Sequence, residues 1–85
     1  MSGNLIPREV SGKLPLFTLT GMEKMQVEQH RGITVFQPDR ISFRTAIGEV
    51  TITGENLRFL SYSAQDATLC GKITGMFHAP GGGFA

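Results

Sequence analysis

The stretch from residue 41 to residue 60 reads ISFRTAIGEVTITGENLRFL, and it decides the fold class. Apolar and polar residues alternate in three short segments, at residues 41–44, 50–53 and 57–60. Gly48 and the Gly-Glu-Asn of residues 54–56 separate these segments. A period of two residues with many β-branched side chains is typical of strands that bury one face. The stretch therefore predicts three consecutive strands joined by tight turns.

The same alternation continues on both sides, at residues 17–20, 25–29, 33–36 and 68–74, where the last segment is expected to end at Gly75. Turn residues recur at roughly 8–12 residue spacing, which indicates an all-β sandwich, barrel or meander. No segment sustains a helical period. We predict an all-β fold of roughly six to eight strands, a small antiparallel meander or curled sheet, sandwich- or barrel-like. A short β-solenoid is the less favoured alternative.

The alternation also predicts the core. A shift of one residue in the pairing of two strands would expose the apolar side chains to water, so these side chains must lie on the buried face. Gly71 lies inside the last segment, which indicates a bulge or the close approach of another backbone. The apolar positions expected on the buried face are Phe17, Leu19, Met25, Val27, Ile33, Val35, Ile41, Phe43, Val50, Ile52, Leu57, Phe59, Leu69 and Ile73.

The chain of 85 residues is long enough for one core only. Residues 1–13 are expected to form an N-terminal arm, because Gly3, Pro7 and Gly12 interrupt any strand or helix period. Residues 14–78 are expected to form the β domain. Residues 79–85 contain three successive glycines and are expected to form a C-terminal tail.

Charge and composition exclude several function classes. The formal net charge is +1, so no bulk attraction to nucleic acid or anionic lipid is expected. No apolar run is long enough to span a membrane, and no secretory leader opens the sequence. A single cysteine, Cys70, cannot form an intramolecular disulfide. These features favour a reducing, intracellular site of synthesis.

Four pieces of sequence occur in an order and spacing that resemble the YabP/YqfC family of sporulation proteins. They are LTG at residues 19–21, VEQHRGI at 27–33, IGEVTITGENL at 47–57 and LCGKI at 69–73. The resemblance covers roughly residues 16–74 and leaves out both ends of the chain. It implies a small non-catalytic β domain of an endospore-forming bacterium, acting in the mother-cell cytoplasm or the spore envelope.

The residues give little sign of catalysis, a cofactor or a metal. His30 and His78 are far apart in sequence, and neither has ligands beside it at the spacing of a tetrahedral site. Cys70 with His30 and Asp66 is the only formal nucleophilic set, and nothing in the sequence activates the thiol. We expect His30 to be a surface residue in a turn. We predict no catalytic, cofactor-binding or metal-binding residue.

Nucleic-acid binding is the first alternative, through a small barrel that combines a basic groove with stacking rings. Glu49 and Glu55 offset two of the basic residues, and the low net charge argues against a phosphate-binding surface. The residues that would carry this function are Arg40, Arg44 and Arg58, with Phe36, Phe43, Phe59 and Tyr62.

Assembly is the favoured function, because an open meander leaves strand edges that can pair with another copy. The first core segment contains no charge, and the ends of the chain supply apolar side chains that a neighbour could bind. We expect a homo-oligomer, as a filament or ring of the spore envelope. A further alternative is an adaptor that docks a sporulation membrane protein by β-addition. The candidate assembly residues are Leu5, Ile6, Val10, Phe77 and Phe84.

Overall fold

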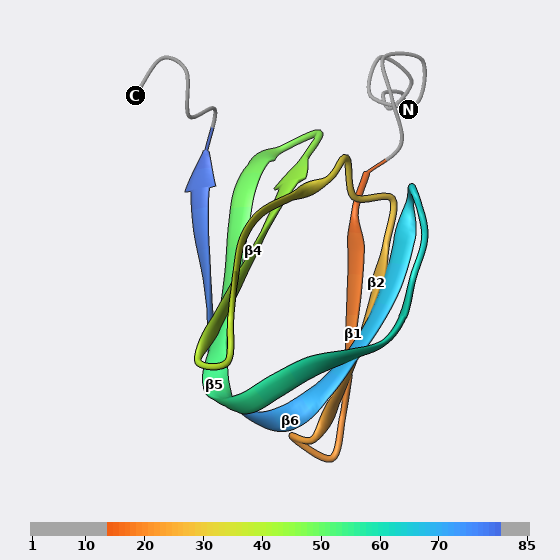
Figure 1. Ribbon diagram of the computed structural model, residues 1–85. Helices are drawn as coiled ribbons and strands as arrows, with labels where there is room; N and C mark the ends of the chain where they lie inside the picture. The colour runs from red at the N-terminus through yellow and green to blue at the C-terminus, as the bar shows by residue number, and fades with distance from the viewer. Residues whose placement is uncertain (1–13, 81–85) are drawn as a thin grey trace, which may run out of the picture.

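The computed structural model describes residues 14–80, which form strands and the short connections between them (Figure 1). The all-β prediction is confirmed, and the strand count lies at the lower end of the expected range. The six strands are β1 (Leu16–Thr20), β2 (Lys24–Glu28), β3 (Ile33–Gln37), β4 (Arg40–Thr45), β5 (Gly48–Tyr62) and β6 (Asp66–Pro80).

All six strands belong to one antiparallel sheet, in the order β1-β2-β6-β5-β4-β3. β3 to β6 form a meander of consecutive strands. The β1–β2 hairpin joins this meander where β2 pairs with residues 66–70 of β6. Residues 29–32 cross from β2 to β3 at the far edge of the sheet. The backbone amide of His30 donates to the carbonyl of Gln65 at 2.8 Å, which anchors this crossing.

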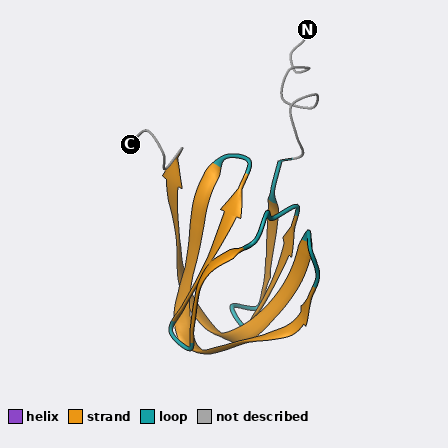
Figure 2. Ribbon diagram, turned by 45° about the horizontal axis from the view of Figure 1, so that its top comes forward, coloured by secondary structure: helices purple, strands orange, loops and turns teal. Residues whose placement is uncertain are grey.

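The sheet is bent into two facing halves, as Figure 2 shows. β5 and β6 are each 15 residues long and pair along their whole length, and both bend near the middle. One half contains β3, β4, the first part of β5 and the last part of β6. The other half contains β1, β2, the first part of β6 and the last part of β5. The predicted curled sheet is therefore confirmed, and the sheet does not close.

Two glycines permit the bend, because the backbones of β5 and β6 approach closely there. A Cβ on Gly71 would lie 2.6 Å from the carbonyl oxygen of Asn56, and Gly71 has a φ of +133°. A Cβ on Gly54 would lie 2.0 Å from the carbonyl oxygen of Lys72. Asn56 has a φ of 54°, beside a shift in the strand register. The close approach predicted at Gly71 is thus confirmed, and a bulge accompanies it.

Two predicted strand boundaries are wrong. Residues 54–56 do not end a strand, because Gly54 pairs with Ile73 and Glu55 with Lys72, so β5 continues through the bend. Gly75 does not end the last strand either. It pairs with Thr53, and β6 continues beside β5 as far as Pro80.

The core lies between the two halves of the sheet, and most of the predicted core is confirmed. Phe17, Ile33 and Phe59 are partly buried against it. Two predictions are wrong: Leu19 is 41% exposed, and Val35 is only half-buried because a bulge in β3 places it opposite Ser42. The buried apolar residues are Met25, Val27, Ile41, Phe43, Val50, Ile52, Leu57, Ala67, Leu69 and Ile73.

Candidate functional site

Four stretches of strand in residues 14–80 have one edge without a neighbouring strand. β1 and β3 end the sheet on its two sides. β2 pairs with β6 only at residues 66–70, so residues 74–80 of β6 pair with β5 alone. In the same way, residues 58–62 of β5 pair only with β6. We call residues 74–80 the β6 edge.

Three of these stretches carry no charged side chain: β1, β3 and the β6 edge contain no Lys, Arg, Asp or Glu. Proteins that remain monomeric commonly protect an edge with charges, a bulge or a proline. β3 has a bulge, and the β6 edge ends at Pro80. β1 has neither feature within the strand. The unpaired backbone groups of β1 and of most of the β6 edge are therefore open to pairing.

An apolar groove lies between the β6 edge and the β1–β2 hairpin. Its volume is about 180 Å³, and nearly all of its walls are hydrocarbon or backbone. We call it the lateral groove. It is lined by Phe17, Leu19, Met22, Met25, Ile73, Thr74, Gly75 and Met76.

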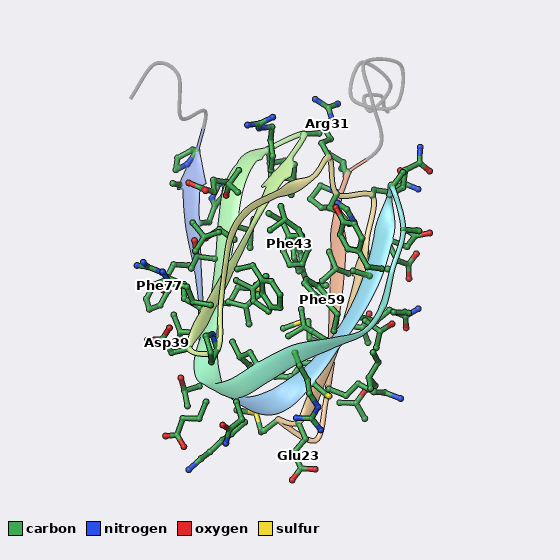
Figure 3. All side chains as sticks on the ribbon, in the orientation of Figure 1. Glu23, Arg31, Asp39, Phe43, Phe59 and Phe77 are labelled. Carbon is green, nitrogen blue, oxygen red and sulfur yellow. The ribbon has the colours of Figure 1, made fainter. Side chains whose placement is uncertain are left out.

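The β6 edge presents one large apolar side chain on each face of the sheet. Met76 pairs with the buried Ile52, so it lies on the inner face, where it borders the lateral groove and is 52% exposed. Phe77 pairs with Thr51 and lies on the outer face, 62% exposed. Figure 3 shows the Phe77 side chain pointing away from the core. A strand added here would find apolar contacts on both faces.

The opposite side of the molecule is closed by aromatic contacts. The rings of Phe36 in β3 and Phe59 in β5 lie 5.2 Å apart between centroids. Phe59 in turn packs edge-on against Phe43 in the core, at 6.2 Å (Figure 3). The two halves of the sheet therefore touch along β3 and the last part of β5. Phe17 of β1 also packs edge-on against Phe43, at 6.5 Å between centroids, while the lateral groove separates the β1–β2 hairpin from the β6 edge.

The prediction that His30 is a surface residue is wrong, because His30 is 2% exposed. Its ring stacks on Tyr62 and packs against Phe43, each at 5.2 Å between centroids. Nδ1 accepts a hydrogen bond from the Gly32 amide at 3.0 Å, so the neutral ring carries its proton on Nε2. That buried Nε2 has no hydrogen-bond partner. His30 is thus a core residue in the connection between β2 and β3.

The formal nucleophilic set is not brought together. Cys70 pairs with Lys24 and Arg58, whose exposed side chains place it on the outer face of the sheet. His30 faces the core instead. Asp66 accepts a hydrogen bond from the Gln29 amide at 3.3 Å. Within residues 14–80, no three His, Cys, Asp or Glu side chains are grouped as a metal ion would require.

Cys70 lines a wide depression of about 490 Å³ on the outer side of the bend. Arg58, Lys72 and Glu23 also line it, and all three are exposed. The guanidinium of Arg58 donates to the carbonyl of Asn56 at 3.3 Å. This depression is open and polar at its rim, with no buried polar side chain directed into it.

The residues named for nucleic-acid binding do not form one surface. Phe43 is fully buried and Phe59 is half-buried, so neither ring is free for a base to stack on. Arg40 and Arg44 lie on β4, with Arg44 directly opposite Glu49 as expected. Arg58 lies beside the bend and lines the depression that contains Glu23, Cys70 and Lys72, and neither Arg40 nor Arg44 lines this depression.

Phe77 is the one candidate assembly residue among the described residues, and it lies exposed on an unpaired edge. Leu5, Ile6, Val10 and Phe84 lie outside the described residues. Met76 and the lateral groove were not predicted. Ile73 and Met76 lie on the same inner face although they are three residues apart, because the register shifts between Ile73 and Gly75. Continued alternation from Ile73 would have placed Met76 on the outer face. No sequence signal shows that the β1–β2 hairpin ends beside this part of β6, because their pairing is long-range.

The geometry defines a class of protein: a small open β-sheet whose available features are strand edges and an apolar groove. The sequence matches the YabP family over residues 13–81, and the chain belongs to this family. It is a sporulation-related protein of an endospore-forming bacterium. No curated protein and no solved structure matches the chain. Residues 14–80 contain no helix of the length and apolar character needed to cross a membrane.

Proposed function

We propose that the chain is a non-catalytic structural protein that assembles with copies of itself through its free strand edges, as a filament or ring of the spore envelope. The observation that carries this proposal is the set of three uncharged, unpaired stretches, β1, β3 and the β6 edge. An unpaired edge offers a row of backbone donors and acceptors to a strand of another chain.

Apolar surface beside these edges supplies the driving force. Leu16 and Leu19 on β1, Phe36 on β3, and Met76 and Phe77 on β6 are each more than 40% exposed. Burial of apolar surface contributes roughly 25 cal/mol per Å², and association costs offset part of that gain. A strand that pairs at any of these edges would cover at least one of these side chains. Backbone pairing and apolar burial therefore act at the same places.

Sedimentation velocity of the full chain over a range of concentrations tests the proposal. We expect species larger than the 9.2 kDa monomer, with a weight that rises with concentration. A variant with one lysine in each uncharged edge, Thr18→Lys, Gln37→Lys and Thr74→Lys, is expected to weaken association at least about tenfold. The reason is that an added strand would partly bury each lysine side chain and remove water from its ammonium group.

The control variant adds the same charge away from the free edges, as Gln26→Lys, Ala46→Lys and Gln65→Lys, which are all exposed positions. Gln26 is the direct cross-strand neighbour of Thr18, but β2 is paired on both sides. We expect this control to associate like the unmodified chain. A full chain that stays monomeric at millimolar concentration would refute self-assembly and leave β-addition to a membrane partner as the use of these edges.

A further inference from the structure

We propose that the β6 edge and the lateral groove bind the N-terminal arm of a second copy, residues 4–7, as an added antiparallel strand. This inference rests on the proposed function and names the donor and the receptor of the contact. The contact is head-to-tail, because arm and groove are different surfaces. Such contacts give rings where they close and filaments where they do not.

The β6 edge fixes what kind of segment fits. An added strand would place consecutive side chains on opposite faces of the sheet. One would enter the lateral groove beside Met76, and the next would lie over Phe77 on the outer face. The segment must therefore carry two adjacent apolar residues. It must also be uncharged where it pairs, because the groove walls offer no counter-charge.

Residues 4–7, Asn-Leu-Ile-Pro, meet these requirements. Leu5 and Ile6 are adjacent and apolar, and they match the adjacent Met76 and Phe77 of the β6 edge. No charge occurs before Arg8. Pro7 lacks a backbone N–H, and proline is tolerated in an edge strand, where alternate residues direct this position toward solvent.

Strand direction favours the arm of another copy over the chain's own arm. β1 runs toward the end of the molecule where β5 and β6 bend, and the last part of β6 runs away from that end (Figure 1). A strand antiparallel to the β6 edge must therefore run in the same direction as β1. Antiparallel pairing is the more stable arrangement per residue. A second copy can supply its arm in this direction freely.

The chain's own arm is joined to the start of β1 and cannot do so. With residues 4–7 paired, residues 8–15 would have to return along β1 to its start and reverse direction twice. About five extended residues, or about 17 Å, are needed to match the five-residue β1. The remaining three residues are too few for two reversals of direction, because each tight turn takes at least about two residues. The own arm could only lie parallel to the β6 edge.

Cysteine crosslinking in a Cys70→Ser background tests the inference with the full chain. One chain carries Leu5→Cys and another carries Met76→Cys, and the two are mixed and oxidised. We expect a disulfide-linked dimer of the two variants. As a matched control, Leu5→Cys is mixed with Thr34→Cys, on the unpaired β3 at the other side of the molecule, and we expect at least tenfold less dimer.

A single chain carrying both Leu5→Cys and Met76→Cys distinguishes the two origins of the arm. We expect crosslinked ladders of several chains. A monomer closed by its own disulfide would overturn the inference, because it would show that the chain's own arm lies in the groove. Absence of the mixed dimer, while the full chain still assembles, would also overturn the inference but leave the proposed function standing. Loss of all assembly would refute both.

Association of a Leu5→Ser, Ile6→Ser variant gives an independent measure. Each buried aliphatic side chain is worth at least about tenfold in a dissociation constant, so we expect the loss to exceed about a hundredfold. Ser2→Ala, in the same arm, is the control and should leave association unchanged. In the proposed assembly the arm is bound by another copy, so thermal unfolding should be the same for all three chains at concentrations where each is monomeric. Equal association of the Ser variant and the control would contradict the inference.

Discussion

Gly71 is the residue on which the bent shape depends most. Its φ of +133° lies in a region that other residues rarely adopt, and the space beside it is filled by the backbone of β5. A neighbouring backbone cannot move aside as a flexible side chain can. Gly21 also has a positive φ, +59°, in the β1–β2 turn, but nothing lies within 4 Å of where its Cβ would be. The two glycines thus differ in both respects, because +59° lies in the left-handed helical region and +133° lies outside it.

Gly71→Ala is therefore predicted to destabilise the fold by about 3 kcal/mol, because the new methyl group adds a clash with the carbonyl of Asn56 to the strained φ. Gly21→Ala adds no clash and only the milder strain of the left-handed helical region, so it is predicted to cost about 1 kcal/mol. Urea unfolding followed by circular dichroism measures both. Equal costs for the two variants would show that β5 and β6 do not approach as closely as the structure indicates.

His30 shows why a residue's environment is hard to predict from its neighbours in sequence. Gln29, Arg31 and Gly32 make the segment read as an exposed turn. The ring is buried because Phe43 and Tyr62, from two distant strands, enclose it. Only the pairing of residues 29–32 with Gln65 and Arg44 brings these groups together. Local polarity carried no information about that arrangement.

At the scale of the strands, alternation was a sufficient guide to most of the sheet. It predicted β2, β4 and the buried face of β5, because each buries one face against the core. It failed where one local signal has two meanings. Gly54 and Asn56 suit a turn and a bend equally well, and only the pairing with Lys72 and Ile73 decides for the bend. The lateral groove also depends on long-range pairing, that of β2 with β6, and therefore could not be predicted from local sequence signals.

The aromatic contact between β3 and the last part of β5 closes one side of the molecule, and its strength can be measured. We predict a coupling free energy of about 1 kcal/mol between Phe36 and Phe59, the usual range for an aromatic pair in contact. The measurement is a double-mutant cycle with Phe36→Leu and Phe59→Leu, read from urea unfolding. Phe17 and Phe36 form the control cycle, because no contact joins their rings among the aromatic pairs of residues 14–80. Equal coupling in both cycles would mean that the two halves do not meet at Phe36.

At the scale of the whole molecule, the main feature is that its two sides differ. One side is closed by Phe36 and Phe59, and the other exposes the β6 edge and the lateral groove. In the proposed assembly, residues 14–80 provide the receptor on this open side, and the donor is the segment before β1 that carries the apolar residues 5, 6 and 10. A molecule with one receptor and one donor can extend in a single direction. That is the geometry required for a ring or filament.

The same reasoning predicts how association responds to salt. The uncharged edges and the apolar groove contain no ion pair to screen, so the apparent dissociation constant of the full chain should change less than about tenfold between roughly 50 and 200 mM NaCl. Proteins that bind nucleic acid through six to ten phosphate contacts lose about 10³–10⁵ in affinity over this range. Sedimentation velocity of the pure chain measures the first quantity, and fluorescence anisotropy with a labelled 20-nucleotide single strand measures the second. Salt-resistant assembly without binding of the oligonucleotide is the expected outcome. Apolar burial and backbone pairing do not depend on screened charges, so assembly should resist salt. The nucleic-acid alternative would be favoured if the chain did not associate with itself and bound the oligonucleotide with a steep salt dependence.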